Sequence, residues 1–410
     1  MRTSESAAKN GNDRLTPYLT GLMVLLCFAT FSEGFDFFCM SLVINSLATG
    51  FHVEIDNVFK LVVAGVNCGA VAGFFVTRLA DRFGRRPIFL ISFIAFNVCG
   101  LLTAFSPNLY YYLALQFLAK MFLVTEFGIA VVMVSEEFPA ARRGTFVAIL
   151  QVAGALGGGA ALFASSVVMP AWGWRGMYWV GAIPLAVVPV IVFYVRETGH
   201  FEQVRASGAG MRRSLMHIWS TPSRRNVVVV GALWFLAYLC YAGVIYAWPT
   251  FAEVERGWDV QRVGTRVAVA FALGMLGYIV AGMMMDLIGR RATGVLFFLG
   301  SAASLIWCFS AHEPYMVPAI ATAMFFIFAL LPICSTYNSE LFPTEQRADA
   351  AAWCNYLFGR PAQVAAPVVI GMIEGIGPAA RTLAIGPFLA IFVVLFLLPE
   401  TKGIKLDKVN

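Results

Sequence analysis

Long apolar runs separated by short polar stretches dominate the chain from residue 17 onward. A bilayer core about 30 Å thick needs roughly 20 apolar residues to be crossed by one helix, and twelve segments have about that length. They are residues 17–47, 58–78, 88–106, 109–134, 145–170, 176–196, 226–250, 262–285, 293–311, 315–337, 349–374 and 380–398. The pattern predicts an all-α membrane protein with twelve transmembrane helices.

Two polar stretches flank these segments, and a third divides them into two sets of six. We expect residues 1–16 to form an N-terminal arm, residues 197–225 a linker and residues 399–410 a short tail. The linker contains charges of both signs. It separates an N-terminal half, predicted over residues 17–196, from a C-terminal half, predicted over residues 226–398.

A polar motif between the second and third apolar segments recurs in the second half. Residues 77–86 read T-R-L-A-D-R-F-G-R-R, and residues 282–291 read G-M-M-M-D-L-I-G-R-R, an offset of 205 residues. A second motif, E-x-x-P-x-x-x-R, begins at Glu136 and again at Glu340, an offset of 204 residues. Two unrelated motifs with nearly the same offset indicate an internal duplication, which is common among secondary transporters.

The duplicated motifs contain charges that can pair and glycines that allow tight turns. Asp81 can sit at the positive N-terminal end of a neighbouring helix, and Arg85 can pair with a carboxylate such as Glu136 or Glu137. We predict a latch that holds one arrangement of the two halves and releases in the other, although these charges could also serve only to orient the chain. The latch candidates are Asp81, Arg82, Gly84, Arg85, Glu136, Arg143, Asp286, Gly289, Arg290, Glu340 and Arg347.

Composition supports the membrane assignment, because 13% of the residues are charged whereas soluble domains average roughly 25%. The net charge of +6 comes from basic residues that cluster in alternate loops. This asymmetry places both termini in the cytoplasm and the chain in the inner (plasma) membrane. It favours contact with anionic membrane lipids and excludes nucleic acid as a partner. The cysteines lie in apolar segments without a C-x-x-C, so we expect no metal site.

Five charged residues lie inside predicted membrane segments, where each costs at least about 2.5–3.5 kcal/mol. They are Glu33, Asp36, Lys120, Glu126 and Arg360. Our hypothesis is that the three carboxylates take up and release a proton. Arg360, whose guanidinium can bind a carboxylate in bidentate fashion, would then bind an anionic substrate together with Lys120. In the competing interpretation the five charges only neutralise one another, and Lys120 pairs with Glu126 or Asp36.

Further residues are candidates for lining the same site. Pro361 is expected to break its helix beside Arg360 and free backbone groups there. The glycines Gly154, Gly157, Gly158 and Gly159 are expected to allow close helix packing. Packing or an interfacial belt is the competing interpretation for each aromatic candidate. The lining candidates are Asn67, Gln116, Gln151, Trp234, Tyr241, Tyr246 and Asn355.

The paired D-x-x-G-R-R and E-x-x-P…R motifs and the twelve segments together resemble the major facilitator superfamily over the whole chain. Thr77 departs from the glycine that this family usually has in its first motif. Residues 33–36, E-G-F-D, are similar to the D-G-x-D of aromatic-acid and metabolite proton symporters. Residues 125–128, T-E-F-G, are similar to the G-E-x-G of metabolite and sialic-acid symporters, and Arg360 matches the G-R of aromatic-acid symporters.

The resemblance implies secondary active transport by alternating access, with the proton as coupling ion, no other cofactor and a monomeric chain. The leading expectation is symport of a small organic anion, such as an aromatic acid or a mono- or dicarboxylate. A sugar facilitator is an alternative, because the tail reads P-E-T-K-G, but residues 226–250 lack the glutamines of sugar porters. A zwitterion–proton symporter, a drug–proton antiporter and a non-transporting sensor are further alternatives. No nucleophile–base pair or nucleotide motif suggests an enzyme.

Overall fold

The computed structural model describes residues 16–139, 142–206, 215–343 and 346–402. Within these ranges the chain is helical and contains no strand. The predicted N-terminal arm, the middle of the predicted linker and most of the predicted tail lie outside the described residues. The all-α membrane fold expected from the apolar pattern is confirmed.

The first half consists of long helices joined by short connections. Its elements are α2 (Pro17–Gly50), α3 (Ile55–Asn57), the π-helical η1 (Val58–Val63), α4 (Ala64–Phe83), α5 (Arg85–Thr103), α6 (Leu109–Glu137), α7 (Arg143–Gly181), η3 (Ile183–Val187) and α8 (Val188–Tyr194).

Two short linker elements and the second half follow. They are α9 (Gly199–Ala206), η4 (Leu215–Ser220), α10 (Arg224–Ala242), η5 (Gly243–Ala247), α11 (Trp248–Val254), α12 (Val260–Gly274), α13 (Leu276–Ile288), α14 (Arg290–Cys308), α15 (Met316–Glu340), α16 (Arg347–Ala351), η7 (Ala352–Gly359), α17 (Pro361–Met372), α18 (Ile376–Thr382), α19 (Ile385–Phe392) and η8 (Val393–Leu397).

Ten uninterrupted apolar spans occur in the described residues, where the sequence predicts twelve segments. One span, Arg143–Tyr194, contains both the fifth and the sixth predicted segments. Gly173 has a φ of 65° and kinks α7 between them, but the backbone is helical on either side. The eleventh predicted segment is divided into α16, η7 and α17, so it does not form one regular span.

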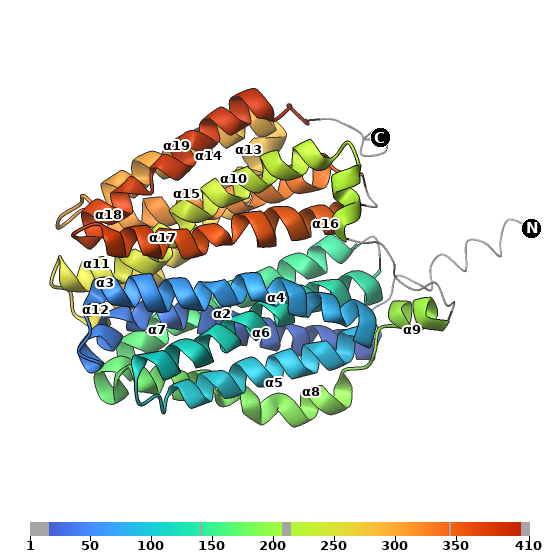
Figure 1. Cartoon of the computed structure of the whole chain (residues 1–410), viewed down its shortest axis with the longest axis horizontal. Helices are drawn as coiled ribbons and strands as arrows, with labels where there is room; N and C mark the ends of the chain where they lie inside the picture. The colour runs from blue at the N-terminus through green and yellow to red at the C-terminus, as the bar shows by residue number, and fades with distance from the viewer. Residues whose placement is uncertain (1–15, 140–141, 207–214, 344–345, 403–410) are drawn as a thin grey trace, which may run out of the picture.

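The two halves form two layers of helices that lie side by side (Figure 1). In this view α2 to α8 form the lower layer, and α10 with α13 to α19 form the upper layer. The second-half helix α12 packs against α7 of the first half, and α17 packs against η1 and α4. We call the end with α9 and α16 the motif end, because the duplicated motifs lie there, and the opposite end the far end.

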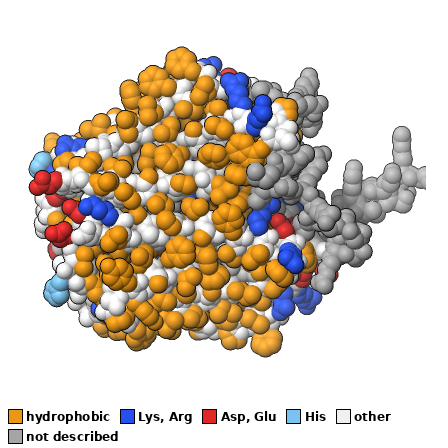
Figure 2. All heavy atoms as spheres, in the orientation of Figure 1, with side chains coloured by type: hydrophobic (Ala, Val, Ile, Leu, Met, Phe, Trp, Pro, Cys, Tyr) orange, Lys and Arg blue, Asp and Glu red, His pale blue; other side chains and the backbone are white. Residues whose placement is uncertain are grey.

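The surface of the bundle has the polarity of a membrane-spanning protein (Figure 2). Hydrophobic side chains cover the visible face, and charged side chains gather toward the motif end and the far end. Large apolar side chains are exposed along this band, including Phe75, Phe163 and Phe193. Such a belt is expected of helices that lipid tails surround.

Small residues allow helices α2 and α7 to approach closely. A Cβ atom added to Gly34 would lie 1.9 Å from the carbonyl oxygen of Gly154, and one added to Gly157 would lie 1.9 Å from that of Phe31. Gly158 faces the ring of Phe38. The packing role predicted for Gly154, Gly157 and Gly158 is therefore confirmed. The same prediction is wrong for Gly159, which has no neighbour within 4 Å.

Candidate functional site

The membrane-embedded charges gather where the two halves meet. Glu33 and Asp36 come from α2, Lys120 from α6, and Arg360 from the junction between η7 and α17. Lys120 is buried, whereas the other three are half-buried. The charges of Glu33, Asp36 and Arg360 all act on Lys120, and those of Lys120 and Arg360 act on Glu33. The fold thus joins charges from positions 33 to 360 into one cluster.

The two cations of this cluster have aromatic partners. The ammonium of Lys120 lies 3.5 Å from the centre of the Phe37 ring, and the guanidinium of Arg360 lies 4.8 Å from the centre of the Tyr356 ring. Within the described part of the chain, neither cation has a carboxylate oxygen within 4 Å. Nε of Arg360 has no hydrogen-bond partner there. The predicted alternative, an ion pair of Lys120 with Glu126 or Asp36, is not formed in this structure.

The three carboxylates face different surroundings. Glu126 is fully buried, and neither of its oxygens has a hydrogen-bond partner among the described residues. The charge that acts on it is that of Glu33. Glu33 faces Gly154 of α7, whereas Asp36 faces Gly100 of α5, inside the first half. An ionised carboxylate without a donor is costly in an apolar interior, so binding a proton would relieve that cost at Glu126.

The regular helical hydrogen bonding is interrupted at Arg360, where the sequence predicts a break, although the Arg360 backbone keeps helical angles. In η7 the Arg360 amide donates to the carbonyl of Asn355, five residues earlier, at 2.9 Å. Pro361 then begins α17 and has no N–H to continue the preceding hydrogen-bond ladder. The break places the guanidinium at the junction of two helical segments.

An aromatic wall lies beside Lys120. Phe37 lies 6.5 Å from Tyr241 and 6.4 Å from Tyr246, measured between ring centres. The Tyr246 hydroxyl donates to the side-chain oxygen of Asn67 at 3.0 Å and so links the two halves. The structure therefore brings together the predicted candidates Asn67, Tyr241, Tyr246 and Lys120. Phe37 was not singled out from the sequence, because one phenylalanine among many in an apolar helix gives no signal.

The remaining lining candidates are more dispersed. Asn355 accepts a hydrogen bond of 3.1 Å from Tyr238. The Trp234 ring packs against the same tyrosine in a tilted arrangement, with ring centres 5.3 Å apart. Gln116 is buried and donates to Thr103 of α5 at 3.0 Å, inside the first half. Gln151 is exposed on α7. Among the described residues, neither glutamine forms a hydrogen bond with the charge cluster.

In the first-half motif, one arginine organises the surrounding contacts. Arg85 pairs with Glu136 at 2.9 Å and with Asp81 at 3.4 Å. The carboxylate of Glu197 accepts from the backbone amide of Arg85 at 2.8 Å. Gly84 has a φ of 106°, and a Cβ there would lie 2.2 Å from a Glu197 oxygen. Glycine therefore permits both the turn and the approach of the carboxylate.

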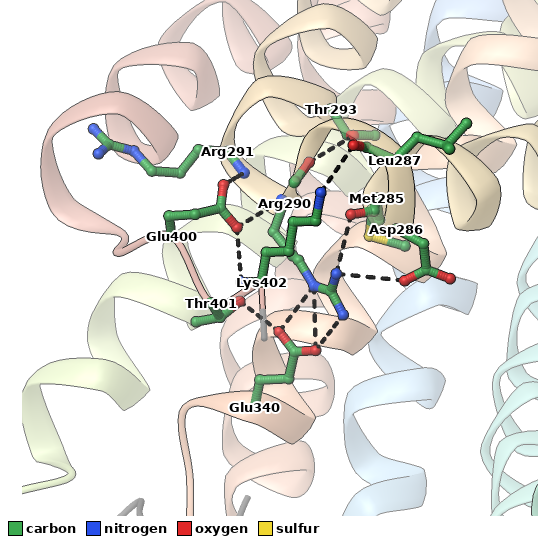
Figure 3. Close-up of polar contacts among 11 residues, drawn as sticks. Met285, Asp286, Leu287, Arg290, Arg291, Thr293, Glu340, Glu400, Thr401 and Lys402 are labelled. Carbon is green, nitrogen blue, oxygen red and sulfur yellow. Dashed lines mark hydrogen bonds and ion pairs between the residues drawn. The ribbon is translucent and has the colours of Figure 1, made fainter. Parts of the chain in front are cut away.

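The second-half motif repeats these contacts (Figure 3). Arg290 pairs with Glu340 at 2.9 Å and with Asp286 at 3.4 Å. Glu400 accepts from the backbone amides of Arg290 and Arg291, each at 2.9 Å. Gly289, with a φ of 94°, takes the place of Gly84.

Hydrogen bonding controls the protonation of Glu400. Partial burial raises the pKa of this carboxyl, but the backbone N–H groups of Arg290, Arg291, Lys402 and Thr401 lower it more, so that the pKa falls below its usual range. The carboxylate therefore stays charged at neutral pH.

The duplication includes a pair of residues that the sequence analysis missed. Thr198 donates to Glu136 at 2.6 Å, and Thr401 donates to Glu340. Together with Glu197 and Glu400, these threonines form two E-T pairs offset by 203 residues. The signal was present, because R-E-T-G follows the sixth apolar segment as P-E-T-K-G follows the twelfth.

Each of these networks lies within one half, and a different ion pair joins the halves at the motif end. Arg78 of α4 contacts Asp349 of α16 at 2.9 Å. At the far end, Asn45 donates to Glu253 at 2.7 Å, from α2 to α11. Neither pair was predicted, because partners separated by about half the chain leave no local pattern.

The other latch candidates make local contacts. Arg82 is exposed and lies over the ring of Phe83. Arg143 and Arg347 each donate to the carbonyl five residues earlier, at 3.0 and 3.2 Å. These two arginines thus support equivalent turns in the two halves. The latch function of the whole set stays a prediction.

Comparison with known proteins supports the fold class and the family resemblance inferred from the motifs. The profile of the Major Facilitator Superfamily matches residues 26–367 and 235–408. The niacin transporter of Acinetobacter baylyi is 26% identical, over 84% of this chain and 85% of the relative. The cis,cis-muconate transport protein of the same organism is 26% identical, over 90% of this chain and 91% of the relative. The 4-hydroxybenzoate transporter of Pseudomonas aeruginosa is 23% identical, over 83% of each chain.

Among solved structures, a crystal structure of a D-xylose–proton symporter superposes with a TM-score of 0.77 and covers 95% of this chain and 100% of that one. The sequence identity is 18%, so this likeness concerns the fold alone. The matched profile covers most of the chain, and it agrees with the twelve predicted segments and the duplicated motifs. The chain therefore belongs to the Major Facilitator Superfamily and is a transport protein rather than an enzyme.

Proposed function

We propose that this protein is a proton-coupled symporter of small organic anions that works by alternating access. The observation that carries the proposal is the charge cluster between the halves, in which Lys120 and Arg360 lack a carboxylate partner within 4 Å among the described residues. An anionic substrate would supply the missing counter-charge, and hydrogen bonds to charged groups are worth about 1.5–3 kcal/mol each. The nearby carboxylates would carry the proton, with no other cofactor.

The aromatic wall supports a planar substrate. Phe37 contacts Lys120 and lies near Tyr241 and Tyr246, and ring stacking adds about 0.5–1.5 kcal/mol beyond the burial of apolar area. The names of the relatives, which refer to niacin, muconate and hydroxybenzoate, point in the same direction. We therefore propose aromatic acids and unsaturated mono- or dicarboxylates as the substrate class.

The contacts between the halves fit a rocking mechanism. Arg78–Asp349 joins the halves at the motif end and Asn45–Glu253 joins them at the far end. Each pair would have to break when its own end opens, while the other end stays closed.

The proton gradient would supply the energy for uptake. A proton moving down a membrane potential supplies roughly 2.3 kcal/mol per 100 mV. This is enough to drive the uptake of an anion against its gradient when the number of protons exceeds the charge of the anion.

The orientation and assembly state belong to the same proposal. We propose a monomer in the inner membrane with both termini in the cytoplasm, because the motif end carries the basic loops. Membrane lipids would then surround the exposed apolar belt.

The test is uptake into proteoliposomes, with and without an inward proton gradient. The panel contains labelled nicotinate, cis,cis-muconate and 4-hydroxybenzoate, with glucose, xylose and betaine as alternatives. Gradient-stimulated uptake of one of the acids is the expected result. Uptake of glucose or xylose that ignores the gradient would support a sugar facilitator, which the P-E-T-K-G tail favours.

The role of Arg360 is tested by Arg360→Lys. Lysine keeps the charge but loses the planar fork that binds a carboxylate with two parallel hydrogen bonds. We expect uptake of the acid to fall about 10- to 100-fold, the equivalent of losing one charged hydrogen bond. Arg262→Lys is the matched control, because Arg262 pairs with Glu313 on the surface. Wild-type rates in Arg360→Lys would contradict the assignment.

A further inference from the structure

Two buried tyrosines lie between the far end and the charge cluster. The hydroxyls of Tyr112 and Tyr178 are 2.5 Å apart, and their side chains are 0% and 1% exposed. Tyr112 lies in the first turn of α6, next to the exposed cap residue Asn108. The Tyr112 backbone therefore lies about one helical turn, roughly 5 Å along α6, from an exposed polar residue.

A thiol connects this pair to a membrane carboxylate. Cys39 is 1% exposed and interacts with the Tyr178 hydroxyl. It follows Asp36 by three residues on α2, so the two side chains lie on the same face of that helix. The charge of Asp36 acts on Cys39, Tyr112 and Tyr178 alike. The four groups thus gather in one region inside the first half, which we call the track.

The packing around the track is otherwise apolar or weakly polar. The titratable and charged groups that face it are Cys99 of α5, on which Asp36 also acts, and Lys120 of α6, which interacts with Asp36. Arg175 lies at the far end of the track, where it stacks on Trp174 at 4.2 Å and donates to the Ser106 carbonyl at 3.0 Å. Trp174 in turn packs on both tyrosine rings.

We propose that Tyr112, Tyr178 and Cys39 form a proton relay from the far end to Asp36. The relay rests on the proposed function, since it supplies the proton that the symport consumes. When the far end is open, Tyr112 accepts a proton from a hydronium ion, which leaves as water, while its own hydroxyl proton passes to Tyr178. Tyr178 passes its proton to the sulfur of Cys39, and the thiol proton moves to the Asp36 carboxylate. Each relay group ends neutral, Asp36 ends protonated, and rotation of the hydroxyl and thiol groups resets the track.

The acids lie one after another along the bundle axis, starting from the relay. Cys39, Asp36 and Glu33 follow one another along α2 toward the motif end, and a helix rises about 1.5 Å per residue. The charge of Asp36 acts on Glu33, and that of Glu33 on Glu126. Asp36 is therefore the acceptor for a proton that comes from the far end, whereas Glu33 and Glu126 lie further along the same route.

The decisive variant replaces both tyrosines by phenylalanine. Removing both hydroxyls leaves neither tyrosine position with an unpaired polar group, and only the weakly polar Cys39 thiol loses a partner, so folding should change little. We expect gradient-driven uptake to fall about 10- to 100-fold, because positioned proton-transfer groups contribute factors of that order or more. Exchange of labelled for unlabelled acid at equal pH on both sides should stay near wild type, because it needs no net proton transfer. The acid used is the panel member that the wild type accumulates.

The thiol is tested by a matched pair of variants. Cys39→Ser keeps an O–H that can relay and should retain gradient-driven uptake, whereas Cys39→Ala should lose it. Tyr110→Phe is the control for the tyrosines, because Tyr110 is 76% exposed on the same turn of α6.

Three results would overturn the inference, and they differ from one another. Normal gradient-driven uptake in the double phenylalanine variant removes the relay and leaves the symport proposal intact. An equal loss of uptake and exchange, together with a lower melting temperature, makes the tyrosine pair structural. Wild-type uptake that no proton gradient stimulates overturns the proposed function itself, and the relay with it.

Discussion

At the scale of single residues, the two motif glycines are the positions with the least freedom to change. Gly84 and Gly289 have φ values of 106° and 94°, which L side chains rarely adopt. Each also makes room for a carboxylate, of Glu197 and Glu400 respectively. Backbone shape and electrostatics therefore require the same residue at both places.

We predict that Gly84→Ala destabilises the protein by about 1–3 kcal/mol from backbone strain alone, and by more if Glu197 is displaced from the amide of Arg85. Thermal unfolding in detergent measures the loss. The matched control is Gly282→Ala, since Gly282 lies in the repeated motif with no neighbour within 4 Å. Equal melting temperatures for the two variants would show that the turn is not strained.

At the scale of helices, the contact between α2 and α7 fixes the position of the carboxylates. Gly34 and Gly157 bring the two backbones together, and Glu33 lies next to this contact on α2, facing Gly154. Helices that approach through small residues have little tolerance for added volume. The geometry of the charge cluster thus depends on residues that carry no charge.

We predict that Gly34→Ala lowers both stability and uptake. The added methyl group would meet a backbone carbonyl at 1.9 Å, so the helices must separate. Overpacking of this kind costs about 1–3 kcal/mol, and sometimes more. The control is Gly159→Ala on α7, whose added methyl group meets no atom within 4 Å. Melting temperature and uptake should fall together in the first variant and remain unchanged in the second.

At the scale of the whole molecule, contacts at its two ends hold the halves together. The Arg78–Asp349 ion pair is partly exposed, and pairs of this kind contribute about 1 kcal/mol or less. That amount is small for stability, but roughly a fivefold change in an equilibrium between closed and open states. Weak contacts suit a transporter, since each end must open in every cycle.

We predict that Asp349→Asn increases the population open at the motif end about fivefold or less, whereas Asn45→Ala increases the population open at the far end. Distances between spin labels on the exposed side chains of Leu79 and Ser339 report the first change. Glu313→Gln is the control, because the Arg262–Glu313 pair lies within one half. Unchanged label distances in Asp349→Asn would mean that this ion pair does not restrain the motif end.

The sequence by itself determined the fold class, the duplication and the identity of the embedded charges. The length of an apolar segment and the cost of burying a charge depend only on the residues of that segment. Twelve segments and five charged residues could therefore be identified without knowing the fold. The helix break beside Arg360 was equally local, because proline acts on its own backbone. A partner for Arg85 was predicted only as Glu136 or Glu137, and the structure selects Glu136 and repeats the pair as Arg290–Glu340.

Only the tertiary structure decided which groups meet across the chain. It placed Lys120 on Phe37, paired Arg78 with Asp349, and set Tyr112 beside Tyr178. It also gave the eleventh predicted segment the π-helical stretch η7 before the predicted break. The physical reason is that a contact depends on helix rotation and on close approach at small residues. Neither quantity is encoded in the spacing of any single segment.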